Sequence, residues 1–442
     1  MKVMIDVLLA CAIVAVVTLA SRQLQAPTPV VVWDAGQYYR MAAEFSSGAR
    51  PYAESPYVFR VGVPRFASAI ATVPARGFFI VNLTAALGIA ALLMVWLRAW
   101  GVTRAVALMM VGLAAAAWHG PARYIYYNPG YVDPPFIVLL LAGLLLIRLI
   151  AERHTPGKVV ALALLSGLGA LVRETMVLVP LCFLFVNAPA SGLIGRRSSS
   201  GRVPAAWLIA PLAFCVAGIV WTHAAVTVDS SERASMAAAA FQWLHKPLDS
   251  FVMGWLATFG PVLAIAVFDW RGAVAFLLEH EWLGAFFAGC VVLSFIGGSD
   301  TERFAFWSLP VVYLVLARAI ERWAPVLRNT AVVTALVVTQ AVSARVFWGI
   351  PDPHAESVVS LATGAGWLDR IYGIANRLFV IDSFHFNLWS SFGSRPFRLL
   401  RIGMYLIVMG GLVGLMALHD RKIALRPLGR AGHGAEHGRV GE

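Results

Sequence analysis

Apolar runs long enough to cross a lipid bilayer recur along almost the whole chain. They lie near 3–20, 77–97, 105–118, 132–150, 204–226, 251–269, 283–297, 304–320, 330–349 and 400–418. A helix needs about 20 apolar residues to span a hydrocarbon core about 30 Å thick. Of the 442 residues, 60% are hydrophobic and only 13% are charged, and the mean hydropathy is +0.75, which excludes a soluble domain of this size. The sequence therefore predicts an all-α polytopic integral membrane protein.

One further run, 159–186, is longer than a single span requires. Arg173 and Glu174 lie at its middle, and adjacent charges at the centre of a bilayer are costly. We therefore expect two short spans, near 159–172 and 175–188, with the two charges at an aqueous turn between them. With this division the chain crosses the membrane about twelve times.

Basic residues in the short connections set the expected orientation, because cytoplasmic loops carry an excess of Lys and Arg. The side of Lys2 also collects Arg98, Arg104, Arg148, Arg153, Lys158, the segment 195–202, Arg318, Arg322, Arg328 and the tail. We therefore expect both termini in the cytoplasm, a transmembrane domain over 1–420 and a flexible basic tail over 421–442. The setting that fits is a bacterial inner or plasma membrane. The long loops 21–76 and 351–397 then face outward.

Charge and cysteine content exclude several classes of function. The net charge of +12 gathers between apolar runs and in the tail, where topology and anionic lipids explain it better than nucleic acid does. The four cysteines lie inside apolar runs without paired spacing. The sequence has no Walker loop, no GxGxxG motif after a strand and no zinc-type spacing of Cys and His. We expect no nucleic-acid partner, no metal and no cofactor.

The stretch 31–66, directly after the first apolar run, holds a carboxylate beside the membrane. The spacing of its residues predicts a short amphipathic helix with one face made of Asp34, Tyr38, Met41 and Phe45. Asp34 has two interpretations. It is either a functional acid or only the N-cap of this helix, with Gln37 completing a capping box.

Two more acidic positions begin apolar runs on the same outer side. Asp133 precedes Pro134, so an N-cap followed by Pro at the first helical position explains it without a function. The segment 299–303, SDTER, reads as a capping box, which leaves Asp300 and Arg303 as solvated charges at a helix end.

Three charges remain at outer turns. Arg60 has a structural interpretation as a side chain that snorkels to the headgroups, and Arg173 and Glu174 have one as a local ion pair. Taken together, however, an acid in the first outer loop and arginines at other outer turns predict an acidic cleft that binds anions. Such a cleft suits transfer from a lipid phosphate.

Four short motifs then resemble the GT-C superfamily of polytopic glycosyltransferases, which use sugars linked to lipid phosphates. They are WDAGQYYRMA (33–42), FRVGVPRFA (59–67), GALVRETMVLVP (169–180) and GGSDTERFAFWSLP (297–310). The first is similar to a motif of GPI-type and related bacterial mannosyltransferases, in which the acid is the catalytic residue. Many members carry two acids together in this loop. Here Asp34 stands alone, which favours a base that works without a metal.

The resemblance implies an inverting glycosyltransferase on the extracytoplasmic face. Its donor would be a polyprenyl-phosphate sugar, and its acceptor a hydroxyl of a glycan, lipid or protein. Asp34 is expected to act as general base. The remaining site residues fall into three groups: Arg60, Arg173 and Arg303 for the leaving phosphate, Asp133, Glu174 and Asp300 for holding the arginines or the sugar hydroxyls, and Tyr38 and Tyr39 for the sugar ring.

A transporter or flippase of a lipid-linked or anionic solute is the alternative function. It would also need about twelve spans, but it predicts polar residues at the bilayer midplane or on both sides. The candidate residues of this chain lie instead at the outer ends of apolar runs.

Overall fold

The computed structural model describes residues 2–22, 34–53, 56–118, 120, 122, 125, 129–187, 204–227, 244–298, 300–344 and 394–424. All regular elements in these residues are helices. They are α1 (Lys2–Arg22), α2 (Asp34–Ser46), η1 (Tyr57–Phe59), α3 (Gly62–Ile70), α4 (Pro74–Ala99), α5 (Arg104–Ala116), α7 (Asp133–Glu152), α8 (Pro156–Val172), η2 (Glu174–Val177), α9 (Leu178–Asn187), α10 (Ala205–Ala225), α12 (Leu248–Phe259), η4 (Gly260–Val262), α13 (Leu263–Phe268), α14 (Trp270–Glu279), α15 (Glu281–Ile296), α16 (Thr301–Phe306), α17 (Leu309–Arg322), α18 (Ala324–Leu327), α19 (Thr330–Ser343) and α22 (Arg395–Ala424). The all-α prediction is confirmed for this part of the chain.

Several of these helices are long and apolar enough to cross a membrane. In the described residues five pass by length and composition: Val3–Ala20, Pro74–Ala99, Asp133–Glu152, Leu248–Phe268 and Arg395–Arg421. The pair α14–α15, bent by 111°, makes a sixth if it forms one span. Shorter apolar helices occupy most of the other predicted spans. The protein is thus a helical membrane protein, while the number of about twelve crossings stays a prediction.

Helices break inside two of the predicted apolar runs, although one of these runs, 251–269, still falls within the candidate span Leu248–Phe268. The run 251–269 turns at Gly260, whose φ of 73° ends α12 before Pro261. The run 304–320 is divided between α16 and α17 just before Pro310. The segment 270–279, expected as a connection, is the helix α14. Periodicity finds apolar stretches but does not show where such a stretch bends.

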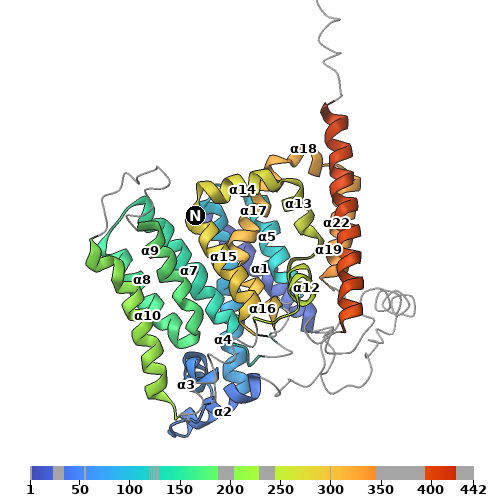
Figure 1. Ribbon diagram of the computed structural model, residues 1–442. Helices are drawn as coiled ribbons and strands as arrows, with labels where there is room; N and C mark the ends of the chain where they lie inside the picture. Colours follow the sequence, from blue (N-terminus) through green and yellow to red (C-terminus); the bar gives the residue numbers. More distant parts are fainter. Residues whose placement is uncertain are drawn as a thin grey trace, which may run out of the picture.

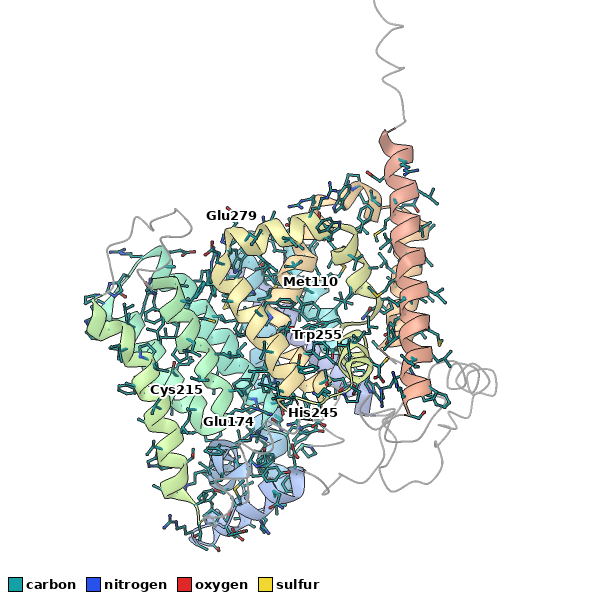
Figure 2. All side chains as sticks on the ribbon, in the orientation of Figure 1. Met110, Glu174, Cys215, His245, Trp255 and Glu279 are labelled. Atoms are coloured by element: carbon teal, nitrogen blue, oxygen red, sulfur yellow. The ribbon has the colours of Figure 1, made fainter. Side chains whose placement is uncertain are left out.

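The helix break predicted within 159–186 is present, but Arg173 is not exposed at an aqueous turn, because its side chain is only 1% exposed. α8 ends at Val172, Arg173 is extended with φ −160° and ψ 133°, and a new helical segment starts at Glu174. The two charges therefore lie at a break between apolar helices, at the end of the bundle where α2 and α3 lie (Figures 1 and 2).

Small residues let neighbouring helices approach closely in the interior. A Cβ added to Gly218 of α10 would lie 2.6 Å from the carbonyl oxygen of Gly167 in α8. α4 turns a face that includes Ile89, Leu93 and Trp96 inward, and the Trp96 indole donates a hydrogen bond of 2.9 Å to the Pro310 carbonyl of α17. These contacts fix the helix ends on which the polar residues lie.

The two ends of the bundle carry different polar groups. One end of the bundle is covered by α2 and α3 (Figure 1). The start of α7, the end of α8 and the start of α17, which follows α16, lie at this end. The opposite ends of the same helices carry Arg148, Lys158 and Arg322, and Glu279 also lies at that end (Figure 2). Basic residues predicted to share one side thus do share one end; the segments 195–202, 351–393 and 425–442 lie outside the described residues. Which end faces the cytoplasm stays a prediction.

The amphipathic helix predicted from 34–45 is present as α2. Its buried residues include Ala35, Tyr38, Met41 and Ala42. Gly130 packs against the first turn of this helix, because a Cβ there would lie 2.6 Å from the Ala35 Cβ. The start of α2 is therefore pressed against the segment that leads into α7.

Candidate functional site

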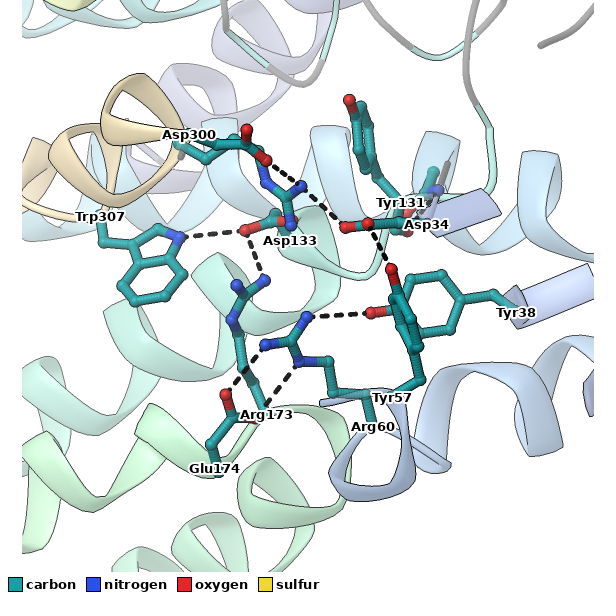
Figure 3. Close-up of polar contacts among 12 residues, drawn as sticks. Asp34, Tyr38, Tyr57, Arg60, Tyr131, Asp133, Arg173, Glu174, Asp300 and Trp307 are labelled. Carbon is teal, nitrogen blue, oxygen red and sulfur yellow. Dashed lines mark hydrogen bonds and ion pairs between the residues drawn. The ribbon is translucent and has the colours of Figure 1, made fainter. Parts of the chain in front are cut away.

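Charged side chains from five parts of the chain meet at the end of the bundle beside α2 (Figure 3). They are Asp34, Arg60, Asp133, Arg173, Glu174, Asp300 and Arg303. All seven were predicted as site residues. Ion pairs join Asp34, Asp133, Arg173, Asp300 and Arg303 into one network, and Arg60 and Glu174 form a separate pair beside it. Six of them lie at or next to a helix end, and Arg303 lies within the short helix α16.

Arg303, on α16, is the centre of this network. Its Nη1 lies 2.9 Å from Asp34 Oδ2 and 2.8 Å from Asp300 Oδ2, and its Nη2 lies 3.1 Å from Asp133 Oδ2. The side chain is only 9% exposed. Arg303 and Asp300 are therefore not solvated charges at a helix end. The N-cap of α16 is Asp300, which makes no side-chain cap hydrogen bond, while Ser299 lies outside the described residues.

Asp133 accepts hydrogen bonds from two other elements. Its Oδ1 receives Arg173 Nη1 at 2.8 Å and the Trp307 indole at 3.2 Å. The N-cap of α7 is Val132. The interpretation of Asp133 as only an N-cap is therefore wrong, because its carboxylate faces the cluster.

The charges at the α8 break pair with different partners. Arg173, 1% exposed, reaches Asp133 and stacks on the Trp307 ring with its guanidinium carbon 4.5 Å from the ring centroid. Glu174 instead receives two bonds from Arg60, at 3.0 and 3.3 Å. Successive side chains of an extended backbone point to opposite sides, so the local ion pair expected as the alternative is replaced by two longer-range pairs.

Arg60 is buried rather than directed to the surface. It follows η1, donates to the Tyr38 hydroxyl at 3.2 Å and holds Glu174 with its Nε and Nη2. The snorkelling interpretation is wrong for this residue. Its two partners join α2 to the α8 break.

Asp34 is partly accessible, with a side chain 22% exposed, the same fraction as Glu174 and Asp300. Its Oδ1 accepts a hydrogen bond of 3.0 Å from the Tyr57 hydroxyl, and its Oδ2 accepts a hydrogen bond from Arg303 Nη1. Burial by itself raises the pKa of Asp34, but the charges of Arg303 and Arg60, with the hydrogen bonds from Arg303 and Tyr57, outweigh it and lower the pKa below 3.8. Asp34 is therefore ionised at physiological pH.

The side chains of Asp34 and Gln37 make other hydrogen bonds than those of the capping box predicted for α2. The oxygens of Asp34 receive Tyr57 and Arg303, and Gln37 Oε1 receives Arg40 at 2.6 Å. Asp34 is the first residue of α2. Its position at a helix start orients the carboxylate toward the cluster.

The structure does not bring Tyr39 to the charged cluster. Its ring packs against Phe78, with centroids 5.4 Å apart, and its buried hydroxyl has no hydrogen-bond partner among the described residues. Tyr38 is the residue of this pair that touches the site. The prediction of a sugar-facing role for Tyr39 has no support in these contacts.

Three aromatic residues of the site were missed in the sequence. Tyr57 bonds Asp34, Trp307 bonds Asp133, and the guanidinium carbon of Arg303 lies 5.0 Å from the centroid of the Tyr131 ring. Trp307 lies 174 positions from its partner. No local pattern reports such a contact, and the chain is rich in aromatic residues throughout.

The composition of the cluster argues for a functional site. Three arginines face four carboxylates between apolar helices. Replacing buried ion pairs by well-packed apolar residues is often neutral or stabilising, so stability alone does not account for them. Perturbed charged groups gathered at one place mark candidate active sites.

The described residues contain no group of three or more His, Cys, Asp or Glu side chains that could hold a metal ion. Compared with protein-family models, curated proteins and solved structures, the chain matches none of them.

Proposed function

We propose that this protein is a membrane glycosyltransferase of GT-C type. It transfers a sugar from a polyprenyl-phosphate donor to an acceptor hydroxyl on the extracytoplasmic face. The observation that carries the proposal is the contact of the partly exposed, ionised Asp34 with Arg303, at 2.9 Å, inside a cluster that holds two further buried arginines.

The proposed reaction is one displacement at the anomeric carbon. The acceptor oxygen forms a bond to this carbon on the face opposite the phosphate, and its proton passes to Asp34. The bond between the anomeric carbon and the phosphate oxygen breaks, and the electron pair leaves with the phosphate. The configuration is inverted because attack and departure occur on opposite faces.

The arginines supply fixed positive charge for the leaving phosphate. Such charges, held in place before reaction, stabilise the charge that develops in the transition state. Arg173 and Arg303 each keep a buried Nε without a hydrogen-bond partner among the described residues. Each therefore retains a donor that the carboxylates do not use.

The lowered pKa of Asp34 determines when the proton moves. A weakly basic carboxylate takes little of the proton from a free hydroxyl. Transfer becomes favourable once the acceptor oxygen has begun to bond to the anomeric carbon and its own acidity has risen. Displacement of Arg303 from Asp34 toward the donor phosphate would also raise the pKa of Asp34, because Arg303 lowers it.

The test is transfer by purified protein supplied with defined, labelled polyprenyl-phosphate sugars. Asp34→Asn keeps the size of the side chain and removes the base, so turnover should fall by about 10²–10⁴-fold. The matched control is Asp6→Asn, because Asp6 pairs with Arg98 and Arg104 at the other end of the bundle. Undiminished turnover in Asp34→Asn would remove Asp34 as the base.

A further inference from the structure

A lysine that the sequence did not single out lies buried beside the site. Lys246 precedes α12 and is 6% exposed. Its Nζ donates to the Ser294 carbonyl of α15 at 2.8 Å and to the Thr301 hydroxyl of α16 at 3.0 Å. The preceding residue, His245, lies toward the same end of the bundle as Glu174 (Figure 2). One ammonium group thus connects the segment before α12 with α15 and α16.

α16 is also fixed against α12 by its backbone. A Cβ added to Gly254 would lie 2.6 Å from Thr301 Cγ2, and the Thr258 hydroxyl donates to the Glu302 carbonyl at 3.3 Å. All six residues of α16 are buried. Lys246 and α12 hold this helix, and Arg303 extends from it to Asp34.

Burying the charged ammonium group of Lys246 is energetically unfavourable. Burial lowers the pKa of Lys246 to about 8, and the attraction of Glu302 and Asp300 offsets it only in part. The charged form is therefore less favourable in the folded protein than in the unfolded chain. A methionine would fill similar space without this cost.

We propose that Lys246 is a positioning residue that acts through α16 to keep Arg303 between Asp34 and Asp133. Lys246 fixes Thr301, the first residue of α16, and Arg303 lies two residues further along. A shift of α16 would change all three ion pairs of Arg303 together. The effect of Lys246 on turnover rests on the proposed function, whereas its effect on the position of α16 does not.

The first test compares Lys246→Met with Lys158→Met. Lys158 also donates two hydrogen bonds to carbonyl oxygens, both at 2.7 Å, but at the other end of the bundle. We expect Lys246→Met to lower kcat/KM for the donor about ten- to hundredfold, as small displacements at a reacting centre do, with thermal stability unchanged or raised. Lys158→Met should keep its activity. Unchanged activity in Lys246→Met, or a loss that follows a fall in thermal stability, would overturn the inference.

A double-mutant cycle shows whether Lys246 acts through Arg303. In protein that already carries Arg303→Met, Lys246→Met should cause no further loss of kcat/KM, because the group that it positions is gone. Lys246→Arg keeps the charge and donors and should recover most of the activity. Independent, additive losses would contradict the proposal. Lys246→Gln, which retains a donor, replaces the methionine variant if that variant does not fold.

The same cycle measured by thermal unfolding needs no substrate. If the wild-type protein transfers no sugar, the proposed function fails, and coupling between Lys246→Met and Arg303→Met in the unfolding temperature still tests the positioning. We expect the two changes to be non-additive, while Lys158→Met and Arg303→Met are additive. Additivity of the first pair would overturn the role of Lys246 whatever the protein transfers.

Discussion

Asp34 owes its charge state to residues far away in the sequence. Tyr57 lies 23 positions from it and Arg303 lies 269 positions from it, yet both donate to its carboxylate. The sequence showed an acid at the start of an amphipathic helix and could not distinguish a cap from a functional group. The contact of its carboxylate with Arg303, at 2.9 Å, is provided only by the tertiary structure.

Tyr57→Phe tests how the hydroxyl of Tyr57 tunes Asp34. The hydrogen bond to Tyr57 helps to lower the pKa of Asp34, so its loss should raise that pKa toward the ordinary value. A carboxylate whose pKa is lower in the folded state than in the unfolded chain stabilises the folded protein at pH values above its unfolded pKa. This stabilisation is lost as the pH falls through the folded-state pKa. The acidic fall in both stability and activity should therefore move to higher pH. Measured pH profiles that coincide with those of the wild type would contradict this effect.

Asp133→Asn tests whether the cluster depends on its buried carboxylate. The change removes the negative charge that lies 2.8 Å from Arg173 and 3.1 Å from Arg303. Breaking a buried ion pair by removing one partner costs about 3–5 kcal/mol. Glu152→Gln, at the other end of α7, is the control, because Glu152 is 54% exposed and pairs with Arg148 at 3.0 Å. It should cost no more than about 1 kcal/mol. Equal shifts of the unfolding temperature in both variants would be inconsistent with a buried cluster.

At the scale of elements, apolar periodicity predicted where helices occur better than where they bend. α4, α7 and the break at Arg173 follow from apolar runs and from the cost of charge in a membrane. The bends at Gly260 and before Pro310, and the helix α14, were not predicted. These depend on packing between helices, which a local window does not contain.

Gly77→Ala tests the close approach that sets α3 against α4. A Cβ at Gly77 would collide with the Ala67 carbonyl oxygen, and overpacking of this kind typically costs about 1–3 kcal/mol. Gly157→Ala is the control, since nothing lies within 4 Å of a Cβ at that position. Thermal unfolding should show a loss for the first variant only. A Gly77→Ala protein as stable as the wild type would mean that α3 moves without cost.

At the scale of the whole molecule, the bundle separates two sets of charged residues. Acids and arginines meet at the helix ends beside α2 and α3. The helix ends joined by the short basic connections lie at the other end of the bundle (Figure 1). The sequence predicted this separation because the number of spans between the loops and the Lys and Arg content of the short loops assign the same loops to the same side. It could not supply the pairing within either set.

Cysteine labelling in intact cells tests the orientation. Ser47, just after α2, and Gly157, at the start of α8, are both exposed and belong to opposite ends of the bundle. Ser47→Cys should react with an impermeant reagent added outside, and Gly157→Cys only after permeabilisation. The wild-type protein gives the background from its own cysteines. Labelling of both positions from one side would refute the proposed topology.

The most direct test of the central claim is the anomeric configuration of the product. Purified protein in lipid nanodiscs is supplied with a polyprenyl-phosphate sugar of known configuration and an acceptor, and the glycosidic bond is assigned by NMR. A single displacement with Asp34 as base predicts an inverted product from the wild-type protein and almost none from Asp34→Asn. A retained configuration, or inverted product formed equally fast by both proteins, would contradict the account.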